Sequence, residues 1–272
     1  MTKIIAITNQ KGGVAKTTTT LNLGVALARA GKQVLLLDMD PQASLSLCLG
    51  IRRPDELDTT LTTVMQKIME NKDISPGEGI IHHEEGIDLM PSNIELSGLG
   101  TSMVNVMSRE YVLKRYLNLV KQDYDYVLID CLPSLGMLTV NALVAADSVI
   151  VPSQPNFLSV KGLDLLFGTI GQVKRLMNEN LAVDGILLTM VDGRTTNARE
   201  IIESLKESIG QHVRIFDTQI PKSVYVEESN NEGKSVFAYP KSSRAADAYE
   251  KLAKEVVELE RQKNRSRYDR VR

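Results

Sequence analysis

A lysine and a threonine that follow a glycine pair have types and a spacing suited to chemistry. The segment from Lys11 to Thr17 reads KGGVAKT and lies between an apolar run and a helical pattern. Glycines let backbone N–H groups turn towards phosphate oxygens without an obstructing side chain. The start of the helix adds partial positive charge. We therefore predict a phosphate-binding loop, in which Lys16 contacts the β- and γ-phosphates and Thr17 binds Mg²⁺. The predicted nucleotide-contacting residues are Lys11, Gly12, Gly13, Val14, Ala15, Lys16, Thr17 and Thr18.

Two later apolar runs end in aspartate. A Gly-Gly pair that only formed a turn before a helix would not account for these aspartates. QVLLL leads to Asp38 and Asp40, and YDYVLI leads to Asp130. Phosphoryl transfer depends on charge neutralisation and positioning more than on covalent catalysis. Lysines, Mg²⁺ and loop N–H groups would neutralise the charge, and Asp40 would supply the positioning. A helix cap or a solvated strand end is the alternative for Asp38 and Asp130.

Short apolar runs alternate with helical patterns along most of the chain. We expect strands at 3–8, 33–40, 124–130, 148–153 and 183–191, and helices at 18–31, 137–146, 162–180, 197–210 and about 245–262. Continuous apolar strands separated by helices predict a mostly parallel sheet with helices on both faces. The fold class is therefore α/β, a single-domain P-loop NTPase. Residues 52–110 are the least clear region, with a helical piece at 61–70 and a strand at 86–92.

Composition describes a globular chain with a basic end. The 272 residues are 43% hydrophobic and 24% charged, with a net charge of −2. We divide them into a domain, 1–260, and a C-terminal tail, 261–272, which carries a local charge of +5. Contact with nucleic acid would need such a local patch. Two cysteines and no apolar stretch of about 18 residues favour a cytoplasmic protein.

The segment NQKGGVAKTTTTLNLG resembles the ParA/Soj family of chromosome- and plasmid-partitioning ATPases, within the MinD-like superfamily. A lysine at the start of the loop marks the deviant Walker A motif of this group. The resemblance continues in family order through LLLDMDPQASLSLCLG, YDYVLIDCLPSLGMLTVNAL, GILLTMVDGRTTNA and IPKSVYVEESNNEGKSVFAYPKSSRAADAYEKLAKEV. It therefore covers nearly the whole chain.

The resemblance implies a role for each matching residue. Lys11 would cross a dimer interface to the partner's nucleotide, and Asp40 would position or activate the attacking water. Asp130 matches the Walker B carboxylate, and Asp38 would support the magnesium shell. The implied catalytic residues are Lys11, Lys16 and Asp40, the metal site is Thr17, Asp38 and Asp130, and the adenine base is framed by Met190 and Pro221.

The sequence departs from the family pattern at three positions. Ala15 replaces the glycine that usually precedes the phosphate lysine, and Leu132 replaces a proline after the Walker B strand. Tyr225 stands where relatives often carry arginine. The resemblance implies that Arg194 and Lys222 hold DNA phosphates without reading sequence, and the basic tail could compensate for Tyr225.

The same resemblance implies an ATP-driven cycle. ATP and Mg²⁺ would join two subunits in a sandwich homodimer that binds duplex DNA non-specifically, so the protein would be nucleoid-associated. A ParB-like centromere-binding protein would trigger hydrolysis and release, and intrinsic ATPase activity would be weak. No membrane partner is expected.

Three other functions compete with this interpretation. A MinD-like membrane-cycling ATPase would need an amphipathic C-terminal helix, but residues 261–272 contain only Tyr268 and Val271 as apolar residues. A DNA-binding regulator could use nucleotide as a ligand without turnover. An iron–sulfur reductase would need a Cys-Gly-Gly context that the two cysteines lack. The adjacent His82 and His83 are expected in a surface loop, without metal.

Overall fold

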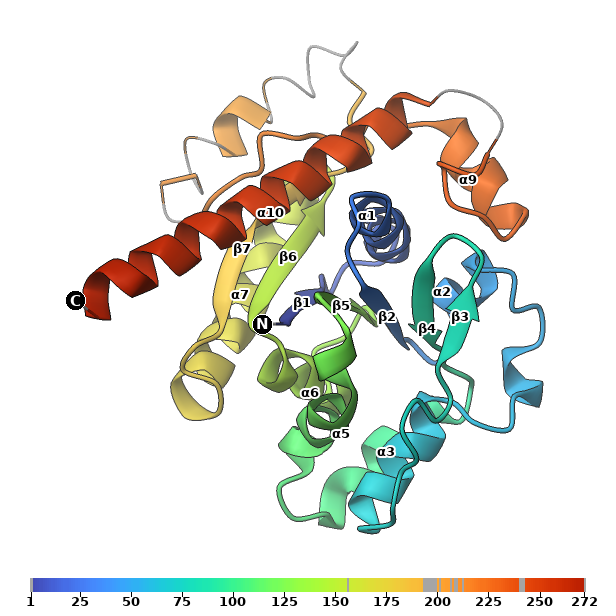
Figure 1. Ribbon diagram of the computed structural model, residues 1–272. Helices are drawn as coiled ribbons and strands as arrows, with labels where there is room; N and C mark the ends of the chain where they lie inside the picture. The colour runs from blue at the N-terminus through green and yellow to red at the C-terminus, as the bar shows by residue number, and fades with distance from the viewer. Residues whose placement is uncertain are drawn as a thin grey trace.

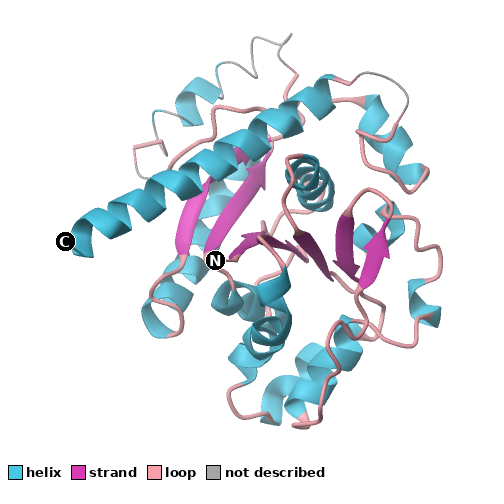
Figure 2. Cartoon of the chain, viewed as in Figure 1, coloured by secondary structure: helices cyan, strands magenta, loops and turns pink. Residues whose placement is uncertain are grey.

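The protein is built around one seven-stranded sheet (Figures 1 and 2). The computed structural model describes residues 2–155, 157–192, 213–239 and 243–271, together with 200, 202–205, 207, 210 and 211. Within these residues the strands are ordered β3-β4-β2-β5-β1-β6-β7, and β3 alone is antiparallel to its neighbour. The strands are β1 (Lys3–Ile7), β2 (Val34–Met39), β3 (Ile81–His83), β4 (Ile87–Met90), β5 (Tyr126–Cys131), β6 (Ser148–Ser153) and β7 (Ala182–Leu188).

Helices cover both faces of the sheet, as the continuous apolar strands predict. One core lies between the sheet and α3, α5, α6 and α7, and the other between the sheet and α1 and α10. α1 and α10 lie side by side (Figure 1). The predicted α/β fold is confirmed. The described α-helices are α1 (Lys16–Arg29), α2 (Ser44–Cys48), α3 (Leu61–Met69), α4 (Leu96–Ser102), α5 (Val112–Val120), α6 (Met137–Ala145), α7 (Phe157–Leu176), α9 (Val224–Asn231) and α10 (Arg244–Val271).

Residues 52–110, the least clear region of the sequence, form well-defined helices and strands. α3 and β4 fall where a helix and a strand were expected. The expectation that His82 and His83 lie in a loop is wrong, because both belong to the edge strand β3. A turn that ends at Gly86, with φ of 77°, allows β3 to pair antiparallel with β4. His82 is exposed there, and its Nδ1 lies 2.7 Å from Asp88 Oδ1.

The last helix is longer than expected, since α10 runs to Val271 rather than ending near 262. The sequence there is rich in arginine, which favours helices, and contains neither glycine nor proline. Tyr126 donates a hydrogen bond to Glu260, and Lys263 pairs with the buried Asp184. The first residues of the basic segment therefore pack against the sheet. No helix in the described part of the chain is long and apolar enough to cross a membrane.

Candidate nucleotide-binding site

The loop between β1 and α1 has the open geometry that a phosphate group needs. Gly12 and Gly13 are exposed, and no atom lies within 4 Å of the position that a Cβ would take on either residue. Gly13 adopts a φ of 70°, which glycine tolerates readily. Ala15 is the N-cap of α1 and adopts φ 64° and ψ 36°, in the left-handed region. Ala15 thus takes the conformation that glycine favours, without glycine's freedom.

Two side chains from the far half of the chain hold this loop. The hydroxyl of Thr189 donates to the carbonyl oxygen of Val14 at 3.0 Å. The side-chain amide of Gln154 donates to the carbonyl oxygen of Gly13 at 2.8 Å. Both hydrogen bonds use carbonyl oxygens of the loop, so they do not compete with a ligand for the loop N–H groups. Sequence reasoning missed both residues, because neither belongs to a local motif.

Lys16 closes the loop from its helical end. The residue is 8% exposed, and its Nζ donates to the carbonyl oxygen of Lys11 at 3.2 Å. Burial lowers the pKa of Lys16, while Asp130 and Asp40 partly oppose this shift. An anion that enters the loop would give the Lys16 ammonium a negatively charged partner in addition to the Lys11 carbonyl.

Asp130 has the chemistry of a magnesium ligand. The residue is 1% exposed, and its Oδ2 has no hydrogen-bond partner in the described structure. Burial and the neighbouring Asp38 raise the pKa of Asp130 well above its ordinary value, against the effects of Thr17 and Lys16. A hard cation bound by carboxylate and hydroxyl oxygens would compensate this buried charge. The predicted pair of Thr17 and Asp130 therefore fits Mg²⁺.

The other two aspartates lie beside this pair but differ in surroundings. Asp38 is fully buried, and burial raises its pKa to about 6. Asp40 is only partly buried, at the end of β2, and its Oδ1 accepts a hydrogen bond of 2.9 Å from the Gln42 N–H. Its charge acts on the ammonium of Lys16. The structure thus places Lys16 and the three predicted aspartates in one electrostatic cluster.

Of the two residues expected to frame adenine, Met190 lies beside Gln154 and Pro221 lines a cavity. Met190, with φ of 52°, is 39% exposed, and its sulfur lies 2.9 Å from the Gln154 amide nitrogen that also contacts the phosphate loop. Pro221 pairs with Val191 in an isolated parallel bridge.

A cavity of about 1050 Å³ adjoins the bridge between Pro221 and Val191, and Lys222 is exposed at this cavity. Arg194 lies outside the described residues. The cavity is lined by Val191, Asp192, Asp217, Thr218, Gln219, Pro221, Lys222, Ser223, Val224, Arg244, Asp247, Ala248 and Lys251.

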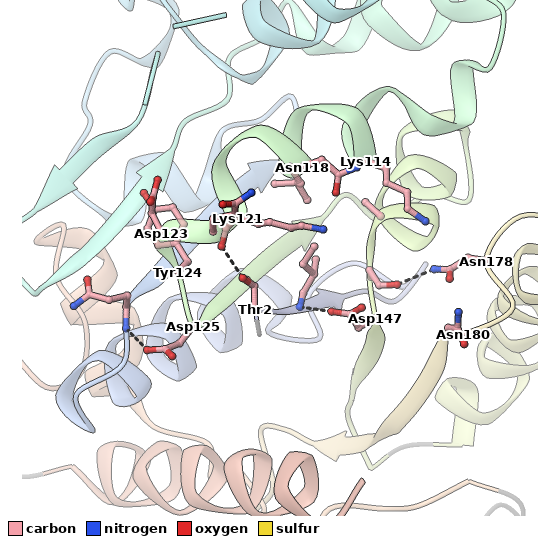
Figure 3. Close-up of a pocket in the computed structure, with 16 residues that line it drawn as sticks. Thr2, Lys114, Asn118, Lys121, Asp123, Tyr124, Asp125, Asp147, Asn178 and Asn180 are labelled. Carbon is pink, nitrogen blue, oxygen red and sulfur yellow. Dashed lines mark hydrogen bonds between the residues drawn. The ribbon is translucent and has the colours of Figure 1, made fainter. Parts of the chain in front are cut away.

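A different cavity, of about 690 Å³, lies at the amino-terminal ends of the strands, opposite the phosphate loop (Figure 3). Its polar groups largely satisfy one another. The Thr2 hydroxyl donates to the carbonyl of Lys121 at 2.6 Å, and the Ile4 N–H donates to Asp147 at 2.8 Å (Figure 3). Ligands of open parallel sheets bind at the carboxyl ends of the strands, where the phosphate loop lies. We therefore assign nucleotide binding to the carboxyl ends of the strands, beside the phosphate loop.

Comparison with known proteins agrees with this site. A family model described as an AAA domain matches residues 2–183. The sporulation initiation inhibitor protein Soj of Bacillus subtilis is 43% identical over 257 residues, which are 94% of this chain and 99% of that protein. The chromosome partitioning protein ParA of Caulobacter vibrioides is 38% identical over 261 residues, 95% of each chain.

Solved structures show the same fold with nucleotide bound. The cobyrinic acid a,c-diamide synthase of Mycobacterium smegmatis, with ADP and magnesium, is 36% identical, has a TM-score of 0.82 and is matched over 94% of each chain. A second structure of that protein holds an ATP analogue and magnesium. This chain is accordingly an ATPase that uses ATP and Mg²⁺. With the phosphate loop, the aspartates and these relatives together, the chain belongs to the ParA/Soj family of P-loop ATPases.

Proposed function

We propose that this ATPase partitions DNA through a nucleotide-dependent dimer. In this proposal ATP joins two subunits face to face, the dimer binds duplex DNA without sequence preference, and a ParB-like centromere-binding protein triggers hydrolysis and release. The observation that carries the proposal is the loop with lysines at both ends. Lys16 is buried against its own loop, whereas Lys11 is partly exposed at the rim. Relatives named for chromosome partitioning support the same function.

Within the site, each residue has a defined task. Lys16 and the loop N–H groups bind and orient the phosphates. Thr17 and Asp130 hold Mg²⁺, which neutralises phosphate charge when bound. Asp40 orients the attacking water, and Lys11 reaches the nucleotide of the other subunit.

Turnover by the protein alone is expected to be slow. The loop from residue 9 to residue 17 contains no arginine. An arginine supplied to the phosphates is worth about 10³–10⁵ in rate where it has been measured. A partner protein that brings positive charge would therefore control release from DNA.

The proposed DNA surface lies around the cavity of about 1050 Å³. Lys222, Arg244 and Lys251 line it, and Arg194 is assigned to the same surface from the family resemblance. Lysine and arginine contacts to phosphates fix position but carry no sequence information. Dimerisation would double the number of such contacts, which explains why the ATP state would bind more tightly.

The test is binding of fluorescently labelled duplex DNA, by anisotropy, at several salt concentrations. With ATP we expect similar affinity for unrelated sequences and a steep loss of affinity with salt. With ADP we expect much weaker binding. Arg194→Ala and Lys222→Ala should each reduce the log–log salt slope by roughly two, since one phosphate per subunit contributes about 0.9.

Lys72→Ala is the matched control, because Lys72 is exposed after α3 and ion-paired with Glu70, away from this cavity. It should leave both affinity and slope unchanged. Equal binding with ADP and ATP would contradict the proposed cycle. Unchanged slopes for both variants would remove the DNA surface from this part of the molecule.

A further inference from the structure

The carboxylate of Asp38 is fully buried, and its hydrogen bonds go to the segment that follows β2. Its Oδ2 accepts from the N–H and the hydroxyl of Ser46, at 2.9 and 2.8 Å. Its Oδ1 accepts from the N–H of Asp40, at 3.2 Å. One carboxylate therefore joins the end of the strand, Asp40 and the first turn of α2.

Ser46 is the counterpart of this arrangement. It is fully buried, and its hydroxyl accepts a hydrogen bond from the Ser92 N–H at 3.3 Å while it donates its one proton to Asp38. Ser92 follows β4, the neighbour of β2 in the sheet. The hydroxyl thus connects two adjacent strand ends through a buried polar network. Such networks rigidify the segments that they join when every member is satisfied.

The segment enclosed by this network contains Asp40. Its backbone N–H is held by Asp38, and its carbonyl oxygen accepts from the Ala43 N–H at 2.9 Å. Ala43 itself has φ of 50°, in the left-handed region. The chain from 38 to 46 is therefore a short strained loop that is closed at its base by the Asp38–Ser46 contacts.

We propose that Ser46, acting through Asp38, is a positioning residue that fixes Asp40 for the attack of water on ATP. This inference rests on the proposed role of Asp40. It gives Asp38 the task of holding Asp40, in place of a position in the magnesium shell. Both oxygens of Asp38 accept hydrogen bonds from protein, whereas Asp130 keeps one oxygen without such a partner.

The expected consequence is a loss of rate without a loss of binding. A displacement of about 1 Å in a catalytic group can cost roughly 10²-fold in rate. The loop contacts that bind phosphate are made by a different segment, held by Thr189 and Gln154. Removing the Ser46 hydroxyl should therefore lower kcat by about 10- to 100-fold and leave nucleotide affinity nearly unchanged.

The experiment compares Ser46→Ala, Ser46→Thr and Ser44→Ala in the full chain, without DNA. Steady-state ATP hydrolysis gives kcat and KM, titration with fluorescent ADP gives Kd, and thermal unfolding reports folding. Ser44 lies two residues away on the same helix, is only partly buried, and is not among the hydrogen-bond partners of Asp38 in the described structure, which are Ser46 and Asp40. We expect Ser46→Ala to lose kcat alone, Ser46→Thr to recover most of it, and Ser44→Ala to match the unsubstituted protein.

Two results would overturn the inference. One is a kcat for Ser46→Ala within twofold of the unsubstituted protein. The other is an increase in Kd as large as the decrease in kcat, which would mean that Ser46 supports the whole site rather than Asp40. Because DNA is absent, a failure of the DNA-binding proposal would leave this result unaffected and would be seen separately.

Discussion

The side-chain ammonium of Lys16 lies 3.2 Å from the carbonyl oxygen of Lys11, so the two lysines of the phosphate loop meet across its opening. The contact links the first residue of α1 with the start of the loop. It forms one edge of the cradle, with Gly12 and Gly13 between the two lysines. The position of the buried ammonium therefore depends on the whole loop, and the loop's affinity for phosphate depends on that ammonium.

Lys16→Met should weaken nucleotide binding strongly. Hydrogen bonds to a charged group are worth about 1.5–3 kcal/mol, which corresponds to roughly a 10- to 100-fold rise in Kd. Titration with fluorescent ADP and Mg²⁺ measures it. Lys32→Met, in the segment that follows α1, is the control and should bind as the unsubstituted protein does. An unchanged Kd for Lys16→Met would exclude Lys16 from the phosphate site.

Ala15→Gly should stabilise the protein, although glycine usually destabilises. The left-handed conformation of Ala15 costs about 1–2 kcal/mol, and the greater freedom of glycine in the unfolded chain offsets about 0.4–1 kcal/mol of the gain. We expect a melting temperature higher by a few degrees. Ala28→Gly, in the regular part of α1, should lower stability by about 1 kcal/mol. Shifts of the same sign in the two variants would contradict the assigned strain.

Asp130→Asn should separate magnesium binding from folding. Because folding raises the pKa of Asp130, its ionised form destabilises the native state, and this loss of stability grows as pH rises from about 4 through the raised pKa. In EDTA without nucleotide, Asp130→Asn should therefore unfold at a higher temperature at pH 8, and the advantage should shrink towards pH 4. Its ATP affinity should depend much less on Mg²⁺, since Thr17 alone would remain to bind the ion. A lower melting temperature at pH 8 would contradict this account.

Gly233→Ala should destabilise the contact between the segment after α9 and the end of α2. A Cβ on Gly233 would lie 2.7 Å from the Cα of Gly50, and Gly233 has φ of 74°. Left-handed strain and overpacking cost about 1–3 kcal/mol each, or roughly 10 °C together in a chain of this size. Gly168→Ala is the control, since this helical position is open and alanine there should stabilise. Thermal unfolding that shows no loss for Gly233→Ala would exclude this tight contact.

The sequence predicted the parts of the site that depend on local spacing. The loop from Lys11 to Thr17 leads into a helix, and Asp38 and Asp130 each lie one residue before the end of a buried strand, so residue types and periodicity sufficed. The register that pairs Asp38 with Asp130 across β2 and β5 has no local signal.

Other contacts were beyond sequence reasoning for a similar reason. Thr189, Gln154 and Ser92 reach the site through hydrogen bonds that involve backbone groups or residues far away in the chain. Backbone partners leave no pattern in residue types. The extra length of α10 was missed because its charged residues resemble a solvated tail, while Lys263 and Glu260 in fact contact the sheet.

The central claim is that ATP itself forms the dimer, and it is tested most directly with Asp40→Ala. This variant should bind ATP but hydrolyse it too slowly to leave the ATP state. Light scattering with ATP and Mg²⁺ should therefore give the mass of two chains of 30.1 kDa, and ADP should give the mass of one. A monomer with saturating ATP, or a dimer that is equally populated with ADP, would contradict the account.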